Sequence, residues 1–356
     1  MKIISQNKFN EFTTVFGKNV NDIIRKYKDP VKWDNYRKNW RDSVNLKSTP
    51  PYPIQLDFEL NYSCNFRCSM CTWSAENTSN KGKSTWISFE LYKEIIDEGV
   101  NKGLSAVRLN YINEPLIRKD IFDFIEYADK KGILDIYFST NGSLLTEDNS
   151  KKLINSGLTR LQVSIDATSK DVFDKVRQGG SYNTVLNNVL KFLDIRKKLN
   201  KELPTLRVNF VKTDLNKHQL DEFLEFWSDK SDCIGIQNLV NIMKPSYNKN
   251  KNINFKCSQP FTHMTLRYDG SLLPCCAFFG AKLPIAKIKN ESKHFISNEK
   301  NLENPETNNL EFLTISKTWN SKRIKELREI HSKGEYYKND VCNQCVNSSS
   351  HIDFEQ

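Results

Sequence analysis

The chain has 356 residues, a formal net charge of +10 and nine cysteines. This length suits one large domain or two ordinary domains with their own cores. No apolar stretch follows Met1 and Lys2, and no apolar run approaches about eighteen residues, so we expect no signal peptide, no membrane partner and a cytoplasmic location. Cysteines in such a protein favour metal or redox use over a disulfide framework.

The positive charge alone does not identify a partner. Lysines are spread along the chain with Asp and Glu between them, rather than gathered in blocks. This distribution is typical of a solvated surface, although an anionic substrate or nucleic acid would also be compatible with the charge. We therefore do not expect nucleic acid to be the partner.

The residues before the first predicted strand form an N-terminal helical extension, which we place at residues 1–50. Residues 10–27 and 31–43 read as two short charged helices. The second helix has an aromatic face, which we expect to pack on the main domain and which consists of Trp33, Tyr36 and Trp40.

From residue 54 to about residue 240 the pattern alternates between strands and helices. The expected strands are residues 56–60, 106–110, 136–140, 160–165, 206–211 and 234–239. The expected helices are residues 89–100, 121–130, 147–156, 182–199 and 219–228. This alternation implies parallel strands joined by right-handed crossovers. Six such units are too few for a closed eight-stranded barrel, so we expect an α/β fold, an open, partial (β/α)6 TIM-like barrel over residues 51–243, with its chemistry at the carboxyl ends of the strands.

Three cysteines follow the first of these strands. Cys64, Cys68 and Cys71 have the spacing C-x3-C-x2-C, and three thiolates this close can serve one metal centre. Zinc usually recruits a fourth Cys or His near by, whereas an iron–sulfur cluster takes one thiolate on each ligated iron. Three ligands on a four-iron cluster would leave one iron open to a small molecule. A zinc knuckle or buried thiols are the alternatives.

The C-x3-C-x2-C motif resembles the signature of the radical S-adenosylmethionine (SAM) enzymes. The resemblance implies a 4Fe-4S cluster on Cys64, Cys68 and Cys71, whose open iron chelates the amino and carboxyl groups of SAM. It further implies reductive cleavage of SAM to a 5'-deoxyadenosyl radical, with an electron donor such as a flavodoxin or ferredoxin.

Other segments look like the SAM-binding segments of the same family. Asn113 and Glu114, followed by Pro-Leu, resemble its Gly-Gly-Glu-Pro motif, which holds the SAM amino group, although both glycines are missing here. Met70 stands where the family often has an aromatic residue beside adenine. Ser164 lies in a segment similar to the family's Ser-Ile-Asp, and Arg177 stands at about the distance where relatives place an arginine on the SAM carboxylate. Each could instead be an ordinary loop, strand-end or helix-surface residue.

After residue 245 the composition changes to a polar linker rich in Asn and Lys. Asp269-Gly270 then predicts a β-hairpin, and residues 321–332 predict a helix. Around these elements lie four cysteines that form a candidate ligand set, Cys257, Cys275, Cys342 and Cys345. A zinc ribbon would use the same four thiolates.

This half resembles the SPASM/Twitch extension of radical SAM enzymes. The resemblance implies a small domain over residues 244–356 that contains a β-hairpin and a helix. It also implies one auxiliary 4Fe-4S cluster on these four cysteines, because no further cysteine follows Cys345.

Two cysteines remain. Cys276 directly follows a predicted ligand on a strand, so its side chain is expected on the face opposite to that of Cys275. It is either a hydrogen-atom donor to a substrate radical, as in some radical SAM epimerases, or a small buried hydrophobe, which we favour. We expect Cys233 to lie in the core.

We therefore expect an enzyme that abstracts hydrogen from a small, sugar-like substrate. Residues 168–199 and 315–345 resemble SPASM proteins of polysaccharide and aminocyclitol gene clusters, which favours a sugar, a nucleotide-sugar or an aminocyclitol. The outcome would be dehydrogenation, dehydration or epimerisation, and a buried hydrophobic Cys276 favours the first two. The alternatives are radical modification of a peptide or protein side chain and, from another class, a zinc-stabilised nucleic-acid-binding protein.

Overall fold

One mixed sheet organises the computed structural model, which describes residues 3–5, 13–71, 74, 85–239, 255–288, 295–297 and 310–348. Its strands follow the order β1-β2-β9-β8-β7-β6-β5-β3-β10-β11-β12. The parallel strands are β3 (Gln55–Phe58), β5 (Ala106–Arg108), β6 (Asp135–Thr140), β7 (Arg160–Ser164), β8 (Thr205–Lys212), β9 (Cys233–Asn238) and β10 (His263–Leu266). The antiparallel edge strands are β1 (Ile3–Ser5), β2 (Thr13–Gly17), β11 (Ser271–Leu273) and β12 (Ala286–Lys287). A separate small sheet pairs β4 (Thr85–Ile87) with β13 (Phe295–Ser297).

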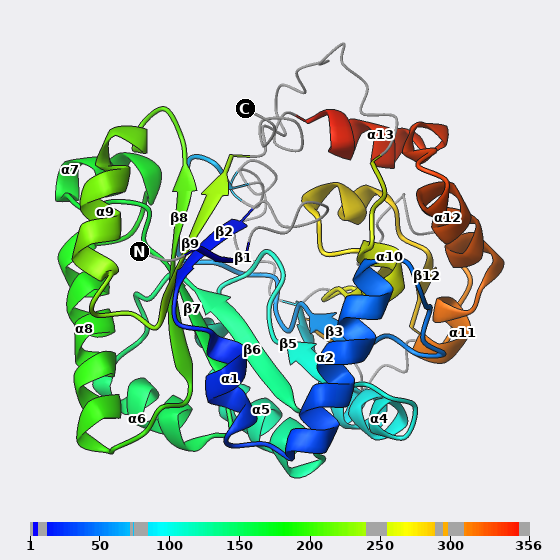
Figure 1. Ribbon diagram of the computed structural model, residues 1–356, viewed down its shortest axis with the longest axis horizontal. Coiled ribbons are helices and arrows are strands. Elements are labelled where there is room, and N and C mark those ends of the chain that lie inside the picture. The colour runs from blue at the N-terminus through cyan, green and yellow to red at the C-terminus, as the bar shows by residue number, and fades with distance from the viewer. Residues whose placement is uncertain are drawn as a thin grey trace.

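Helices cover the outer face of the parallel strands (Figure 1). They are α4 (Phe89–Val100), α5 (Ile121–Lys130), α6 (Glu147–Asn155), α7 (Lys170–Val176), α8 (Tyr182–Lys198) and α9 (Leu220–Trp227), with short 3-10 turns η1 (Pro115–Ile117) and η2 (Lys217–Gln219). Ser88 caps α4 by accepting the backbone N–H of Leu91 at 3.1 Å. The six expected parallel strands and the partial barrel are confirmed.

The two faces of the sheet differ in chemistry. On β6, the side chains of Ile136 and Phe138 are fully buried in the main hydrophobic core, whereas Tyr137 and Ser139 between them are half-buried. Because successive side chains of a strand point to opposite faces, the apolar set faces the helices and the polar set faces the inside of the barrel. Burial of each large apolar side chain stabilises this arrangement by about 1.5–3 kcal/mol.

The N-terminal segment closes the amino ends of the strands with α1 (Val20–Arg25) and α2 (Pro30–Val44). Trp33 and Tyr36 of α2 are buried against Ile54 and Leu134, and this contact confirms that the aromatic face packs on the barrel. The prediction of one helix over residues 10–27 was wrong in its first half, where β2 pairs antiparallel with β9. Residues 13–16, Thr-Thr-Val-Phe, favour a strand, and the edge of β9 gives that strand a partner.

The C-terminal region continues the barrel sheet. The predicted hairpin is confirmed, since β10 pairs antiparallel with β11 around Gly270, which has a φ of 84°. On its other side β10 pairs in parallel with β3. The remaining elements lie beyond it (Figure 1): α10 (Gln259–Thr262), η3 (Phe278–Lys282), α11 (Ile315–Trp319), α12 (Lys322–Ser332), η5 (Tyr336–Lys338) and α13 (Asp340–Asn347).

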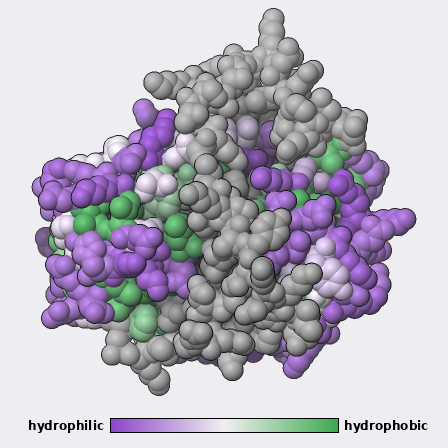
Figure 2. Space-filling view, turned by 90° about the horizontal axis from the view of Figure 1, so that it is seen from above, coloured by the Kyte–Doolittle hydropathy of each residue, from purple (hydrophilic) through white to green (hydrophobic). Residues whose placement is uncertain are grey.

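The surface is mainly polar. Seen from above in Figure 2, hydrophilic residues cover both flanks of the molecule, with smaller apolar areas between them on the left. Many exposed lysines pair with nearby acids, as Lys151 does with Glu147 at 2.7 Å. This pattern agrees with the solvated surface inferred from the scattered charges. Among the residues described here, no helix has the length and apolarity needed to cross a bilayer.

Candidate active site

The cysteine loop, residues 61–71, follows the carboxyl end of β3. Cys68 is buried, and Cys64 and Cys71 are half-buried. Burial is the main cause that raises the pKa of the Cys64 thiol to about 12, and it also raises the pKa of Cys68. Neighbouring thiols of the loop raise both values further, which shows that the three sulfurs lie near one another. Cys64 and Cys68 therefore need a bound cationic centre in order to serve as thiolates.

Backbone contacts hold this loop against the end of α7. The N–H of Arg67 donates to the carbonyl of Gln178 at 2.7 Å, and the N–H of Ser69 donates to that of Val176 at 3.0 Å. Gly180 permits this approach, because a Cβ there would lie only 2.3 Å from a ring carbon of Phe66. The Gly-Gly pair at residues 179 and 180 is a sequence signal for this contact that the predicted site residues did not include.

Glu114 lies beside the cysteine loop, where its backbone N–H donates to the carbonyl of Ser63 at 2.9 Å. Only 2% of this residue is exposed. Its carboxylate accepts hydrogen bonds from the Thr140 hydroxyl at 2.7 Å, the Asn141 N–H at 2.7 Å and the Leu116 N–H at 3.1 Å. Burial raises the pKa of Glu114 to about 7, although these hydrogen bonds lower it. The alternative of a solvated loop acid is therefore excluded, and the site offers a buried carboxylate suited to a cation.

Arg177 follows α7 and faces the same loop. It forms an ion pair with Asp166, with Nε 2.5 Å from Oδ2, and its Nη1 lies 3.4 Å from Cys68 Sγ. Burial opposes the charge of the guanidinium, but Asp166 and Cys68 raise its pKa overall. Asp166 has a φ of 61° and accepts the N–H of Val211 at 2.6 Å. The pair thus fixes a cation next to one of the three thiols.

The other predicted SAM contacts lie in the same region. Met70 is half-buried against the main core, and Ser164 is the half-buried last residue of β7. The side chain of Asn113 is already engaged, since its Nδ2 donates to Asn61 Oδ1 at 2.8 Å and its Oδ1 accepts the N–H of Tyr111 at 3.0 Å. These two bonds fix the orientation of the Asn113 amide and leave one side-chain N–H for a ligand. The roles of these residues toward SAM stay predictions.

The four C-terminal cysteines come together around α13. Cys342 and Cys345 lie in successive turns of this helix. Burial raises the pKa of Cys345, and charges on Cys275, Cys257 and Cys342 would raise it further, so the four sulfurs share one neighbourhood. Gly280 leaves room for Cys275, because a Cβ there would lie 2.6 Å from its Sγ.

His331 was not predicted and lies beside this set. Its Nε2 is 3.4 Å from Cys342 Sγ, and burial lowers its pKa to about 4. Burial thus favours the neutral imidazole, whose Nε2 lies within hydrogen-bond distance of the Cys342 sulfur. The sequence offered one signal for this contact, namely that His331 lies on the helix that precedes the Cys342-x2-Cys345 pair.

The spacing of the thiols distinguishes two kinds of metal centre. Within the part of the chain that the structure describes, the only three His, Cys, Asp or Glu side chains with ligand atoms all within 4.8 Å of one another are Asp57, His263 and Cys276. Neither predicted cysteine set is that compact. A tetrahedral zinc with bonds of about 2.3 Å holds its sulfurs about 3.8 Å apart, whereas a cluster with one iron beneath each thiolate holds them farther apart. As placed, neither set therefore has the spacing of a single tetrahedral zinc site.

Family comparisons agree with this geometry. Residues 58–226 match the Radical SAM superfamily, and residues 257–346 match SPASM, described as an iron-sulfur cluster-binding domain. The chain is a radical SAM enzyme with a C-terminal SPASM domain. Its cofactors are therefore SAM, the 4Fe-4S cluster that binds SAM, and one or more auxiliary iron–sulfur clusters in the SPASM domain. This assignment replaces the alternative of a zinc-stabilised nucleic-acid-binding protein.

Individual relatives are similar to about half of the chain. It is 29% identical over 174 residues to the probable GTP 3',8-cyclase of Methanocaldococcus jannaschii, covering 49% of this chain and 55% of that protein. It is 32% identical over 175 residues to the mycofactocin maturase MftC of Mycolicibacterium smegmatis, covering 48% and 41%. The chain thus spans about half the length of the curated relatives it matches. The SAM-bound crystal structure of Streptococcus suis SuiB has the same fold, with a TM-score of 0.54 at 14% identity over 84% of this chain and 72% of that one.

Cys276 of this radical SAM enzyme lies inside the barrel, among polar groups. Its ligand atom and those of Asp57 and His263 lie within 4.8 Å of one another, and its Sγ is 3.5 Å from Gln259 Oε1. Burial raises the pKa of the thiol to about 12, and Asp57 raises it further. The favoured prediction of a small buried hydrophobe did not foresee these polar neighbours, and the role of Cys276 stays a prediction. The strand argument does not hold either, because β11 ends at Leu273, before both cysteines.

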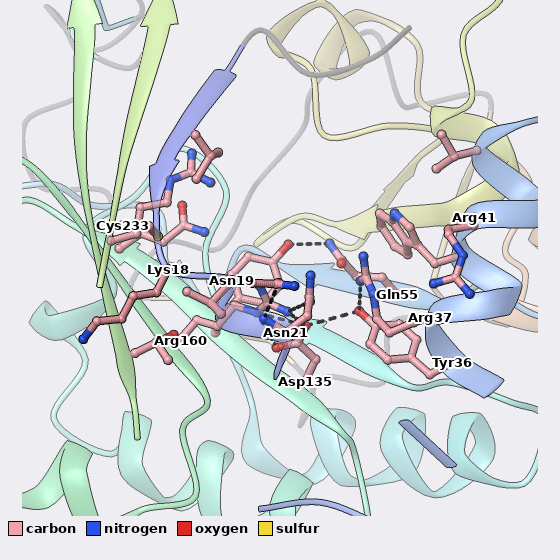
Figure 3. Close-up of a pocket in the computed structure, with 18 of the residues that line it drawn as sticks. Lys18, Asn19, Asn21, Tyr36, Arg37, Arg41, Gln55, Asp135, Arg160 and Cys233 are labelled. Atoms are coloured by element: carbon pink, nitrogen blue, oxygen red, sulfur yellow. Dashed lines mark hydrogen bonds and ion pairs between the residues drawn. The ribbon is translucent and has the colours of Figure 1, made fainter. Parts of the chain in front are cut away.

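A cavity of about 540 Å³ lies at the opposite, amino ends of the strands (Figure 3). We call it the floor pocket. The first residues of β3, β6, β7, β8 and β9 border it, together with α2 and the segment that joins β2 to α1, and the buried Cys233 is one of these residues. Its charged lining consists of Lys18, Arg37, Arg41, Arg160, Arg207 and Asp135. No sequence motif predicted this pocket, because its residues come from seven separate segments.

Proposed function

We propose that this radical SAM enzyme abstracts a hydrogen atom from a sugar, a nucleotide-sugar or an aminocyclitol bound inside its barrel. The observation that carries the proposal is the polar inner face of the parallel strands. Hydrogen-bonding side chains on this face include Gln55, Asp57, Arg108, Tyr137, Gln162, Arg207 and Asn209. A ligand with many hydroxyl groups matches such a surface, since buried polar groups need hydrogen-bond partners.

Two buried groups on this face support a polar ligand directly. Asp57 Oδ2 and His263 Nε2 have no hydrogen-bond partner in the described part of the chain, and these residues are 0% and 3% exposed. The nearest cation to Asp57 Oδ2 is Arg108 Nη1 at 3.8 Å. His263 is positioned by a contact of 2.9 Å between its Nδ1 and Thr262 Oγ1. Hydroxyl groups of a substrate would satisfy both unpaired atoms.

Different residues around the cysteine loop would bind the cluster and the two charged groups of SAM. Cys64, Cys68 and Cys71 would ligate the cluster that, with SAM bound, supplies a 5'-deoxyadenosyl radical. Glu114 would accept the SAM ammonium group, and Arg177 would use the N–H groups left free by Asp166 for its carboxylate. An electron donor such as a flavodoxin or ferredoxin would reduce the cluster.

The SPASM cysteines would hold one auxiliary 4Fe-4S cluster. Cys257, Cys275, Cys342 and Cys345 provide four thiolates, which is the number of ligands that one such cluster takes. His331 would donate a hydrogen bond to Cys342 and so favour the charged form of that ligand.

The net reaction depends on Cys276. The preference for oxidation or dehydration rested on a buried, hydrophobic Cys276, and in the described part of the chain this thiol has polar neighbours. Its sulfur instead lies beside Asp57 and His263 on the inner face of the barrel, where it could return a hydrogen atom to a substrate radical. We therefore propose epimerisation, dehydrogenation and dehydration as equal candidates for the net reaction.

The test is substrate-dependent SAM cleavage by anaerobically purified enzyme. We expect about eight irons per chain, because each of two 4Fe-4S clusters contains four. Under reducing conditions, 5'-deoxyadenosine should form faster with one class among nucleotide-sugars, free sugars and aminocyclitols. Stimulation by peptides alone would overturn the proposed substrate class and favour modification of a peptide or protein side chain.

A further inference from the structure

The floor pocket has more positive charge than its own acid neutralises. Asp135 is the one acid among the described residues that line it, and it pairs with Arg160 at 2.8 Å. Lys18 pairs with Asp232, which lies outside the lining, at 3.3 Å. Arg37 and Arg41 form no ion pair with a carboxylate in the described part of the chain. The pocket therefore favours an anionic ligand.

Arg37 and Arg41 are well placed to bind that anion together. They are four residues apart on α2, so they lie on one face of the helix, and both reach the pocket from the same side (Figure 3). The Arg37 guanidinium is held 5.1 Å from the ring centroid of Tyr36 and 5.8 Å from that of Trp40. Since Tyr36 is itself buried against the barrel, Arg37 is preorganised, whereas Arg41 is exposed and supplies a second guanidinium on the same face of α2. Arginine suits phosphate because its planar fork donates two parallel hydrogen bonds.

An aromatic side chain completes the pocket. Trp40 lines the cavity and is only half-buried, so part of its ring remains available. Nucleic-acid bases stack on such rings regardless of their identity. A nucleoside diphosphate would use both features, with its phosphates on the arginines and its base beside Trp40.

The position of the pocket relative to the SAM site fits a sugar attached to that diphosphate. Tyr137 of β6 lines the pocket, and Thr140 of the same strand donates a hydrogen bond to Glu114. These residues are three apart on the strand, a distance of about 10 Å at about 3.3 Å per residue. Because the two side chains lie on opposite faces of β6, this is a distance along the strand axis, and a sugar ring with its phosphate linkage is long enough to cover it. An aminocyclitol, which carries positive charge, would be repelled at the floor.

We infer that the floor pocket binds the diphosphate of a nucleotide-activated sugar, whose sugar ring extends from there toward the SAM end of the barrel. This inference rests on the proposed function and selects one of its three substrate classes. It assigns Arg37 and Arg41 to the phosphates and Trp40 to the base.

Binding can be measured without catalysis, by anaerobic calorimetric titration of the cluster-loaded enzyme with uridine diphosphate and with pyrophosphate. We expect both probes to bind the wild type, and Arg41→Ala and Arg37→Ala to weaken both by at least about tenfold, because each removes charged hydrogen bonds. Arg41→Lys, which keeps the charge but not the fork, should bind with intermediate affinity. Trp40→Ala should weaken uridine diphosphate alone. The matched control is Lys32→Ala, which removes one exposed cation from the same helix outside the pocket.

Several outcomes would overturn the inference. A wild type that binds neither uridine diphosphate nor pyrophosphate would refute a phosphate site. A loss of affinity in Lys32→Ala equal to that in Arg41→Ala would also refute it. Equal affinity of Trp40→Ala and wild type for uridine diphosphate would refute the nucleoside part. Circular dichroism and iron content identify any misfolded variant. If an alanine variant is misfolded, the affinity of Arg41→Lys is compared with that of the wild type instead. An enzyme that cleaves SAM but binds neither probe refutes only this inference, whereas one that binds both but never cleaves SAM refutes the proposed function.

Discussion

Replacing Glu114 with Gln tests the SAM site at its most buried charged group. The variant keeps one oxygen that can accept the Thr140 hydroxyl or the Asn141 N–H, but its amide nitrogen cannot accept the other bond. It also lacks the charge proposed to meet the SAM ammonium. Removing one partner of a buried charge pair costs about 2–5 kcal/mol, so the dissociation constant of SAM should rise at least about 30-fold. Iron content should stay unchanged, because Glu114 is not a predicted cluster ligand.

The raised pKa of Glu114 adds a pH dependence to this prediction. Its folded pKa of about 7 lies above its ordinary value of 4.5. The folded state is therefore favoured below pH 4.5, and about 3 kcal/mol of that stability is lost as the pH rises through 7. SAM needs the ionised carboxylate, so its affinity for the wild type should fall about tenfold from pH 8 to pH 6, relative to its affinity for the variant.

Equilibrium dialysis of labelled SAM against the anaerobic, cluster-loaded enzyme at pH 6 and pH 8 measures both effects. Glu90→Gln, which changes an exposed carboxylate in the first turn of α4, is the matched control. Unchanged SAM affinity in Glu114→Gln would refute the proposed pairing of Glu114 with the SAM ammonium group. The same pH dependence of SAM affinity in the wild type and in Glu114→Gln would also refute it. Loss of iron from Glu114→Gln would instead show that the residue supports the cysteine loop.

Three further predictions concern the thiols and their surroundings. Replacing Cys64, Cys68 and Cys71 together with Ala should abolish 5'-deoxyadenosine formation, yet leave about four irons on the SPASM cysteines by iron analysis. If Cys276 returns the hydrogen atom, Cys276→Ala should keep iron and SAM cleavage but lose product, and wild-type product made in deuterated water should carry one deuterium at the inverted carbon. Retained turnover by Cys276→Ala would instead indicate oxidation or dehydration. Gly180→Ala should lower stability by about 1–3 kcal/mol in thermal denaturation, because its methyl group overlaps the Phe66 ring, and iron bound at the loop should decrease.

Regular local patterns predicted most of the barrel. The strand predicted at residues 136–140, which ends before Asn141-Gly142, is β6 of the structure to within one residue. The strand β2 escaped prediction because its stability comes from pairing with β9, more than 200 residues later. Local propensity carries no information about such a partner.

The candidate site was predictable only where its residues form a short motif. Cys64, Cys68 and Cys71 lie within eight consecutive residues, so their spacing was visible. The burial of Glu114 was not, because two of its hydrogen-bond donors, Thr140 and Asn141, come from the next strand. The polar environment of Cys276 likewise depends on strands β3 and β10, which are adjacent in the sheet but distant in sequence.

The parallel pairing of β10 with β3 has a consequence for how the chain is made. Residues 55–58 and 106–108 can pair early in synthesis, but the other edge of β3 waits until residues 263–266 have left the ribosome. During that interval the nascent barrel presents an unpaired parallel edge, which is a template for association with other chains. A barrel truncated at residue 243 would keep this edge permanently, so we expect it to aggregate, and pairing with β10 removes the edge once the C-terminal region has been made.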